Sequence, residues 1–354
     1  MNSKIFHAIG LMSGTSLDGL DICYTAFRRN ENNAWNFNIL KAETLPYPPK
    51  WKQLLEQAFL MPAPQLMALH SEYGFYLAET VQKFIQQHHI SQIDVIASHG
   101  HTVFHQPEKK YTLQIGDGRA IYIINNIPTT YDFRSQDVLM GGNGAPLVPI
   151  GDELLFSEYD ACLNIGGFSN ISLKQQDQRI AFDICPVNIV LNFFAQILNK
   201  NYDDNGNLAR QGEINLEILN QLNELKFYSA KGAKSLGREW IETEILPKLK
   251  TLNPKDALAT ATEHAAIKIA QSIEEHQLGN VLITGGGGYN GFLIEKIKEK
   301  TSSSIIIPSR EVVDFKEALI FALMGVLRLQ NENNVLASAT GSSQDHCSGI
   351  LVRY

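Results

Sequence analysis

The sequence predicts an α/β protein with two domains, and three observations support this class. The chain has 354 residues, which is more than a single hydrophobic core usually holds. Segments with the pattern of buried strands alternate with segments that have the period of a helix. A glycine-rich hairpin at Gly14 has a counterpart at Gly166 in the second half of the chain. Because a repeated hairpin suggests two related domains, we expect one over residues 1–140 and one over residues 141–354.

The composition restricts the partners of the protein. A content of 44% hydrophobic and 19% charged residues is typical of a globular chain. The formal net charge of −7 argues against a surface for nucleic acid or anionic membranes. No apolar run approaches the roughly 20 residues of a membrane span, and no signal segment is recognised. Four widely spaced cysteines predict buried or inert thiols. We therefore expect a cytoplasmic protein without nucleic-acid or membrane partners, and a homodimer stays an open possibility.

The first hairpin has the composition of a phosphate-binding loop. Apolar segments over residues 5–12 and 22–27 flank a centre that is rich in glycine, serine and threonine. Glycine lets the backbone approach a ligand closely, and hydroxyl and N–H groups suit phosphate oxygens. No lysine of a Walker motif is present, so phosphate would be held by a hairpin and not by a loop that opens a helix. An ordinary glycine-rich hairpin is the structural alternative.

The first half then alternates between helix and strand. Apolar residues recur every three or four positions over residues 66–85, which predicts an amphipathic helix. Strands are predicted over residues 93–97, 111–116 and 127–133. His99, His101 and His105 follow the first of these strands, where α/β folds place their ligands. A His-x-His pattern can hold zinc, but it needs further ligands, so substrate contact or loop hydrogen bonding is favoured. The glycine-rich segment 141–146 is typical of a hinge or a substrate loop.

The second half begins again with strands. They are predicted over residues 160–165, 171–174 and 179–182. Asp183 follows the last of them and precedes a predicted helix over residues 188–198. Its carboxyl group either caps this helix or acts as a functional carboxylate at a strand end, and the sequence leaves both open. Further helices are predicted over residues 214–225, 238–249, 256–275 and 318–329, the last beginning after Glu317.

A third glycine-rich turn lies late in the chain. A strand over residues 280–284 leads into the turn 285–291 and then into a helix. The turn contains a G-x-G-x-x-G pattern, and Glu311 follows about 20 residues later, as in dinucleotide-binding units. A turn of this kind can equally press its backbone against an adenine or ribose. A nicotinamide-dependent oxidoreductase leaves both hairpins unexplained and is kept as an alternative.

Taken together, these motifs resemble the superfamily of acetate and sugar kinases, heat-shock chaperones and actin. More narrowly, the chain is similar to the anhydro-N-acetylmuramic acid kinase family. The matching motifs cover the chain in order: residues 12–19, 98–100, 112–117, 132–134, 144–149, 163–167, 170–172, 285–288 with Asn290, and 317–318. The resemblance implies an α/β fold of two duplicated actin-like, ribonuclease H-like domains that flank a central nucleotide cleft.

The resemblance also implies an activity and its residues. The enzyme would use ATP, Mg²⁺ and water to convert 1,6-anhydro-N-acetylmuramic acid into N-acetylmuramic acid 6-phosphate, in peptidoglycan recycling. Asp183 would be the catalytic base. His99, Thr102 and Glu317 would contact the sugar, with a helix cap as the alternative role of Glu317. Metal ligands are unknown, with Asp18 as a candidate through a bridging water. ATP would be bound by Gly14, Thr15, Ser16, Leu17, Asp18, Gly19, Leu20, Asp21, Gly166, Gly167, Gly286, Gly287 and Asn290.

The chain departs from the family pattern near these residues. Ile184, Cys185 and Val187 replace residues of an Asp-Thr-Gly-Pro-Gly-Asn motif, and His101 stands where glutamine is usual. Beside the oxidoreductase, two further alternative functions remain. One is a kinase of the same superfamily that acts on another sugar or a carboxylate, and the other is a nucleotide-binding module without catalysis.

Overall fold

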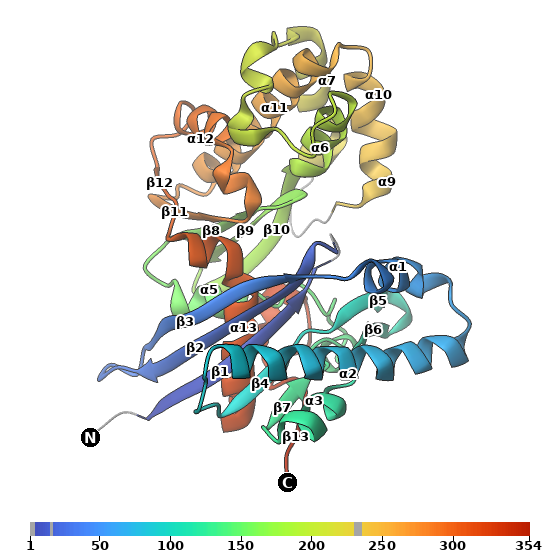
Figure 1. Ribbon diagram of the computed structural model, residues 1–354. Coiled ribbons are helices and arrows are strands. Elements are labelled where there is room, and N and C mark those ends of the chain that lie inside the picture. Colours follow the sequence, from blue (N-terminus) through green and yellow to red (C-terminus); the bar gives the residue numbers. More distant parts are fainter. Residues whose placement is uncertain (1–3, 15–16, 230–235) are drawn as a thin grey trace. The chain divides into compact units, whose positions relative to one another are not determined.

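The computed structural model describes residues 4–14, 17–229 and 236–354 (Figure 1). The chain forms two compact units, each with its own sheet and helices. The first unit combines Met1–Phe156 with Phe315–Tyr354, and the second is Ser157–Asp314. This division differs from the expected domains, 1–140 and 141–354, because the C-terminal segment returns to the first unit.

The first unit is built on a six-stranded mixed sheet. Its spatial order is β13-β7-β4-β1-β2-β3. The first three strands of the chain pair antiparallel, β4 and β7 run parallel to β1, and β13 closes the edge antiparallel to β7. The strands are β1 (Ile5–Ser13), β2 (Gly19–Arg29), β3 (Trp35–Pro46), β4 (Val95–Ser98), β7 (Thr129–Tyr131) and β13 (Ile350–Val352). A separate ribbon pairs β5 (His101–Gln106) with β6 (Tyr111–Ile115).

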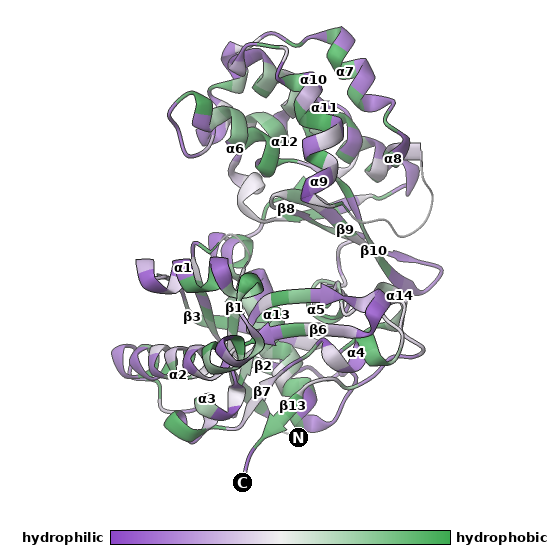
Figure 2. Cartoon of the chain, turned by 90° about the vertical axis from the view of Figure 1, so that its right-hand side faces the viewer, coloured by the Kyte–Doolittle hydropathy of each residue, from purple (hydrophilic) through white to green (hydrophobic). Residues whose placement is uncertain are grey.

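Helices pack on both faces of this sheet. Side chains alternate between the faces of a strand, so Ile9 and Leu11 of β1 share a cluster with the buried face of α2 (Ala63–Gln87). Figure 2 shows α2 changing repeatedly between hydrophilic and hydrophobic colours, as expected of a helix with one buried face. The other helices of this unit, apart from α13, are α1 (Pro49–Gln57), α3 (Gly118–Asn125), α4 (Ser135–Leu139), α5 (Pro149–Leu155) and α14 (Ala337–Thr340), with 3₁₀ turns at Ala58–Leu60 and Pro107–Lys109.

Helix α13 (Arg310–Gln330) explains why the C-terminal segment belongs to the first unit. It packs against β1 so closely that a Cβ atom at Gly10 would lie 1.8 Å from the Ala318 carbonyl oxygen. A Cβ atom at Gly151 would likewise lie 2.3 Å from Ile320. The helix begins earlier than the predicted range 318–329, because charged residues of its first turns hide the apolar period that marks its buried part.

The sheet of the second unit has five strands in the order β10-β9-β8-β11-β12. Again the first three strands pair antiparallel, and the last two run parallel to the first. This is the connectivity of β3-β2-β1-β4-β7 in the first unit, so the predicted duplication is confirmed. The strands are β8 (Ala161–Ile165), β9 (Phe168–Gln175), β10 (Gln178–Pro186), β11 (Asn280–Thr284) and β12 (Ser304–Ile306).

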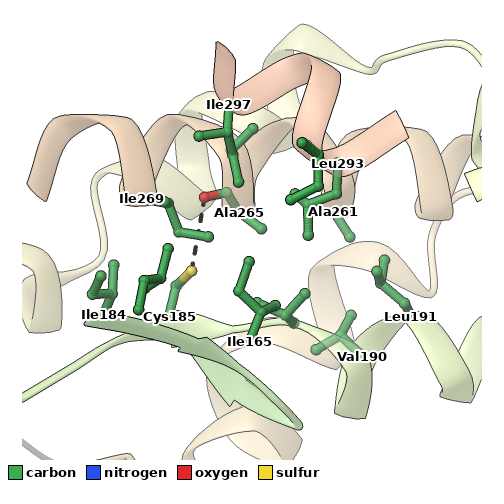
Figure 3. Packing of buried hydrophobic residues seen from close by; sticks show 14 of the residues in the cluster. Ile165, Ile184, Cys185, Val190, Leu191, Ala261, Ala265, Ile269, Leu293 and Ile297 are labelled. Carbon is green, nitrogen blue, oxygen red and sulfur yellow. Dashed lines mark hydrogen bonds between the residues drawn. The ribbon is translucent and has the colours of Figure 1, made fainter. Parts of the chain in front are cut away.

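The core of the second unit lies between one face of this sheet and helices α6, α11 and α12 (Figure 3). The predicted helix over 238–249 contains a π-helical turn at Ile241–Ile245, just before Pro247, which lacks the N–H that a regular turn needs. The helices are α6 (Asn188–Ile197), α7 (Leu216–Asn223), α8 (Lys226–Ser229), α9 (Arg238–Trp240), α10 (Leu246–Leu249), α11 (Pro254–Glu275) and α12 (Gly291–Lys298), with 3₁₀ turns at Asp204–Gly206, Ala209–Gln211 and Gly286–Tyr289.

The cysteine prediction is confirmed for three of the four thiols. Cys23, Cys162 and Cys185 are buried, Cys347 is partly exposed, and all four are free. Burial raises the pKa of Cys23 to about 12, which makes this thiol unreactive at neutral pH. Among the described helices, none combines the length and the hydropathy that crossing a bilayer requires.

Candidate active site

The sheet of the first unit brings three predicted site segments to one edge. Strands β1, β4 and β7 are parallel, so their carboxyl ends meet at the same edge. The hairpin tip follows β1, His99 follows β4, and Arg134 follows β7. The backbone N–H of His99 donates to the Leu11 carbonyl oxygen at 3.0 Å, which ties the histidine loop to β1.

The tip of the β1–β2 hairpin has an unusual backbone. Leu17 adopts a left-handed φ of 57° while its side chain is buried in the core of the first unit. A non-glycine residue held in this conformation indicates a tip whose shape is imposed by its surroundings. Asp18 is exposed, and at Gly19 a Cβ atom would lie 2.6 Å from the Leu45 carbonyl oxygen. Further site residues of this hairpin are Gly14 and Leu20, which are described, and Thr15 and Ser16, which lie outside the described residues.

His99 is held as a neutral imidazole. Arg134 Nε donates to His99 Nε2 at 3.0 Å, so the proton of the ring sits on Nδ1, which donates to the Gly100 carbonyl oxygen at 2.8 Å. Burial, and then the positive charge of Arg134, lower the pKa of His99 well below its usual value. Phe321 of α13 packs against this ring, with the two ring centres 4.8 Å apart. His99 therefore presents no charge of its own.

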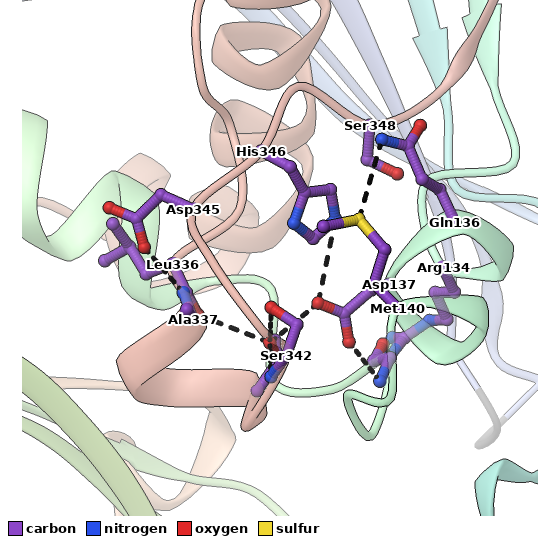
Figure 4. A network of polar contacts seen from close by, with 12 residues as sticks. Arg134, Gln136, Asp137, Met140, Leu336, Ala337, Ser342, Asp345, His346 and Ser348 are labelled. Atoms are coloured by element: carbon purple, nitrogen blue, oxygen red, sulfur yellow. Dashed lines mark hydrogen bonds and ion pairs between the residues drawn. The ribbon is translucent and has the colours of Figure 1, made fainter.

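Arg134 joins the histidine loop to the glycine-rich segment 141–146. Its Nη1 donates to the Gly144 carbonyl oxygen at 2.5 Å, and burial lowers its pKa to about 10. Buried Asp137 accepts from the Gly144 N–H at 2.7 Å and from the Thr340 hydroxyl at 2.7 Å (Figure 4). The segment is thus fixed within the first unit and is not the connection between the units.

Glu317 lies inside α13 and not at its start, so the helix-cap interpretation is wrong. Burial raises the pKa of its carboxyl group, with the nearby Arg134 charge acting in the opposite direction. The negative charge of Asp21 raises the same pKa further. Asp21 itself accepts from the Thr44 hydroxyl of the neighbouring strand at 2.5 Å. An arginine and two carboxylates are therefore electrostatically coupled in this unit.

The three histidines do not gather around a metal. His99 contacts Arg134, whereas His101 Nδ1 lies 3.2 Å from the Ser13 hydroxyl and His105 Nδ1 lies 3.1 Å from the Thr112 hydroxyl. Within the described residues, no group of three or more His, Cys, Asp or Glu side chains could hold a metal ion. Each of the three rings has a hydrogen-bond partner of its own within the first unit, and contact of His99 with a substrate stays a prediction.

Thr102 stands on the β5–β6 ribbon, directly after His101. The Gln114 amide donates to its hydroxyl oxygen at 3.3 Å and to the Thr112 hydroxyl at 2.8 Å. Because its oxygen accepts from Gln114, the Thr102 O–H can serve as a donor to a ligand.

In the second unit, two glycine-rich turns meet at the carboxyl ends of β8 and β11. The turn at Gly166 and Gly167 is tied to the start of α6, since the Val187 N–H donates to the Gly167 carbonyl at 2.8 Å. Gly287 lies so close to β8 that a Cβ atom would be 2.2 Å from Ile165. Gly286 has nothing within 4 Å of its Cβ position, so a ligand can approach its backbone. The structure therefore brings these predicted ATP-binding glycines together within the second unit.

Asp183 lies at a β-bulge of strand β10. It faces Asn170 in the register, Cys185 faces Ser169, and Ile184 is the extra residue. The bulge turns both Ile184 and Cys185 into the core (Figure 3), while the Asp183 carboxylate stays partly exposed. The backbone N–H of Leu236 donates to Asp183 Oδ2 at 2.8 Å. Asp183 is not the N-cap residue of α6, because Val187 occupies that position. Its interpretation as a functional carboxylate remains.

Two further predictions on the third glycine turn need correction or refinement. Asn290 Oδ1 accepts from the Leu293 N–H at 3.1 Å and caps α12, so this oxygen has a structural partner. Glu311 lies in the first turn of α13 and not at the end of a strand, as a ribose-binding carboxylate of a dinucleotide fold would. A nicotinamide-dependent oxidoreductase would therefore lack the acidic residue that binds the ribose.

Some residues of the site were not singled out from the sequence. Asn164, Asn170 and Asp183 are direct register neighbours across β8, β9 and β10, so their side chains share one face. Arg134 is the shared contact of His99 and Gly144. Asp183 and His99 were predicted site residues, whereas Asn164, Asn170 and Arg134 were quoted only as parts of motifs, because their positions beside the site depend on strand register.

The comparisons with known proteins agree with this architecture. The two sheets have the same connectivity, and each has a glycine-rich turn at its carboxyl edge. This arrangement is that of a duplicated actin-like α/β protein. The chain belongs to the anhydro-N-acetylmuramic acid kinase family, whose model matches residues 6–353. A relative with that name from Francisella tularensis subsp. novicida is 31% identical, covering 96% of this chain and 97% of its own length. Another from Pseudomonas savastanoi pv. phaseolicola is 33% identical, over 98% and 99%. The chain is also similar to the solved component A of (R)-2-hydroxyglutaryl-CoA dehydratase from Acidaminococcus fermentans, with a TM-score of 0.46 at 11% identity over 90% of this chain and 97% of that one.

Proposed function

We propose that this protein is the ATP-dependent kinase that opens 1,6-anhydro-N-acetylmuramic acid with water and yields N-acetylmuramic acid 6-phosphate and ADP. Family membership along residues 6–353 supports the substrate and the reaction class. The observation that carries the proposal within the molecule is Asp183, a partly exposed carboxylate at a bulge, oriented by the Leu236 N–H. Bulges next to active sites re-aim a side chain in this way.

Asp183 acts as the general base of the reaction. Its carboxylate takes a proton from a water molecule, whose oxygen bonds to the anomeric carbon of the sugar. The bond between this carbon and O6 breaks, and O6 takes the γ-phosphoryl group while ADP leaves. A base at this position avoids the formation of a free hydroxide, which is worth about 10²- to 10⁴-fold in rate.

The remaining site residues position the reactants. Gly14, the segment 17–21 and the pair Gly166–Gly167 offer backbone N–H groups to the phosphates, and the turn at Gly286–Gly287 offers its backbone to the adenosine. Thr102, Glu317 and the neutral His99 bind the sugar. Thr15 and Ser16 belong to the same phosphate loop. Positioning of this kind is the main task of the protein in phosphoryl transfer.

Mg²⁺ fits the residues of the first hairpin. This ion keeps several waters and binds through one or two carboxylates and substrate phosphates, so it does not need a cluster of protein ligands. Asp18 and Asp21 supply carboxylates beside the phosphate loop, and the charge of Asp21 is close enough to raise the pKa of Glu317. These two residues would hold the ion, Asp18 through water. When bound, Mg²⁺ neutralises phosphate charge.

The cellular setting follows from the reaction. We place it in the cytoplasm, in the recycling of peptidoglycan fragments, with ATP and a small sugar as its substrates. The net charge of −7 supports the absence of nucleic-acid and membrane partners.

The substitution Asp183→Asn tests this proposal. We expect turnover to fall by about 10²- to 10⁴-fold, because an amide cannot accept the proton, while a non-hydrolysable ATP analogue still binds. Turnover is measured as ADP release with the anhydro sugar, and binding by calorimetry. Asp177→Asn is the matched control, since this exposed residue lies in the turn between β9 and β10 and asparagine tolerates its left-handed φ of 61°.

Two results would contradict the proposal. Near-normal turnover of the Asp183→Asn variant would remove this residue from the mechanism. A wild-type protein that phosphorylates common hexoses, and not the anhydro sugar, would assign the chain to another sugar kinase.

A further inference from the structure

Four buried polar side chains form one continuous chain of hydrogen bonds in the first unit. The Tyr73 and Tyr47 hydroxyl groups lie 2.6 Å apart, and the Tyr47 hydroxyl donates to Ser13 Oγ at 2.8 Å. Ser13 Oγ lies 3.2 Å from His101 Nδ1. The four residues are between 0% and 8% exposed. A buried network of this kind can stabilise the fold more than the same hydrogen bonds made separately. The reason is that the loss of one side chain leaves its neighbour with an unsatisfied polar group.

The donors and acceptors of this chain have one consistent direction. Tyr47 has a single hydroxyl proton, which goes to Ser13, so Tyr73 must donate to Tyr47. The Ser13 hydroxyl then donates to His101 Nδ1, its remaining partner among the described residues. The proton of the His101 ring consequently sits on Nε2. Burial lowers the pKa of His101 to about 4, so the ring is neutral at pH 7.

This chain of hydrogen bonds connects two elements that bind different ligands in the proposed function. Ser13 is the last residue of β1 and directly precedes Gly14 of the phosphate hairpin. His101 is the first residue of β5 and directly precedes Thr102 of the sugar-binding ribbon. Tyr47 directly follows β3 and Tyr73 belongs to α2, so the two tyrosines fix both elements to the body of the unit.

We propose that His101 is a positioning residue that sets the phosphate hairpin against the sugar-binding ribbon through its hydrogen bond to Ser13. This inference rests on the proposed function, because it assumes that the hairpin binds the nucleotide. His101 acts through Ser13 and touches neither ligand. Loss of this bond therefore weakens nucleotide binding, although His101 stands on the ribbon.

The test compares variants of the full chain, with His101→Gln, Ser13→Ala and a double variant added to the three described first. His101→Leu removes the acceptor for Ser13, and Tyr47→Phe removes the donor to it. Tyr24→Phe is the matched control, because its hydroxyl donates to the Gln92 carbonyl at 2.8 Å and has no part in the hydrogen bonds from Tyr73 to His101. For each variant, calorimetry gives the affinity for a non-hydrolysable ATP analogue, ADP release gives the KM for the anhydro sugar, and thermal unfolding gives Tm.

We expect His101→Leu to weaken binding of the analogue by about tenfold and to raise the KM for the sugar, since a buried donor loses its partner. Tyr47→Phe should weaken binding of the analogue by about threefold to tenfold, and Tyr24→Phe should leave it unchanged. His101→Gln should restore most of the affinity, because the glutamine amide oxygen can accept from Ser13. Ser13→Ala combined with His101→Leu should weaken binding no more than the stronger single variant.

The opposite results overturn the inference. One is a His101→Leu variant with a lower Tm but wild-type affinity for the analogue, which is what a purely structural role predicts. Another is additive losses in the Ser13→Ala and His101→Leu double variant. A wild-type protein that binds the analogue but does not turn over the anhydro sugar contradicts the proposed reaction instead, and the analogue affinities then still decide the role of His101.

Discussion

His99, His101 and His264 are buried residues that the fold holds in the neutral form. Burial lowers the pKa of each, to about 4 for His101 and about 3 for His264. His264 is fully paired, with the Asn223 side-chain oxygen 2.8 Å from Nδ1 and the Tyr228 hydroxyl 2.8 Å from Nε2. In the unfolded chain the same rings titrate near pH 6.5. Between these pH values the unfolded state binds more protons than the folded state.

This difference predicts that the protein loses stability as the pH falls below about 6.5. The histidines contribute their full stability above the unfolded pKa, and at pH 5 His101 and His264 have each lost about 2 kcal/mol of it. Urea unfolding at pH 7, 6 and 5 measures the loss. His264→Asn should reduce the slope of stability against pH, whereas His89→Asn, at an exposed position, should not. An equal unfolding free energy at pH 7 and pH 5 would contradict this account.

At the scale of residues, the sequence left several side chains with two interpretations, and local geometry decided between them. Asp183 and Glu317 were each expected as a helix cap or a site residue, and neither caps a helix. Asn290 caps α12 through its side-chain oxygen, and its expected role in ATP binding stays a prediction. Capping depends on the residue at which a helix begins, and a pattern of apolar residues locates that residue only to within a turn.

At the scale of elements, both glycine-rich hairpins were predicted, but the strands β3 and β5 were not. Alternation of apolar residues and glycine-rich turns are local signals, and β1, β2, β8 and β9 follow them. The bulge at Ile184 could not be predicted, because it depends on how β10 pairs with β9. The early start of α13 was missed for a similar reason, since its first turns are polar.

A buried ion pair anchors α13 to α5, and its loss should destabilise the first unit. Lys316 Nζ lies 2.6 Å from Asp152 Oδ1, and the two side chains are only 6% and 3% exposed. Lys316→Met should lower the free energy of unfolding by about 3–5 kcal/mol, because the Asp152 carboxylate is left buried and uncompensated. Urea unfolding measures this change.

The matched control for this pair is the double variant Lys316→Met with Asp152→Leu. It removes both charges and should recover most of the lost stability, as apolar replacements of buried pairs often do. A single variant within about 0.5 kcal/mol of the wild type would show that the pair does not hold α13 in place.

At the scale of the whole molecule, the chain leaves the first unit after Phe156 and re-enters it at Phe315. The returning segment carries the buried face of α13 and the edge strand β13, which pairs with β7. The second unit is one continuous segment with its own sheet and hydrophobic core. A division by chain order into two halves misses this arrangement, because duplication does not require each unit to be continuous.

The division predicts how fragments of the chain behave. Residues 157–314 alone should fold and show cooperative urea unfolding, because they contain every strand of their sheet. Residues 1–156 alone should not fold cooperatively, because they lack α13, which packs against β1 at Gly10. Circular dichroism during urea titration measures both, and the control joins residues 315–354 to residues 1–156 through a flexible linker.

Two outcomes would contradict this division of the chain. One is a fragment 1–156 that folds cooperatively without the returning segment. The other is a fragment 157–314 that stays unfolded in the absence of urea.

The sequence by itself determined the α/β class, the repeated hairpins, the family and most of the glycines at the turns, because each depends on residues that are close along the chain. Only the tertiary structure decided that α13 from Phe315 onward belongs to the first unit. It also decided that Asn164, Asn170 and Asp183 are neighbours across three strands. The hydrogen bond between Ser13 and His101 likewise appears only in the fold. These contacts join residues far apart in the chain, and their geometry depends on strand register and helix packing, which no local pattern encodes.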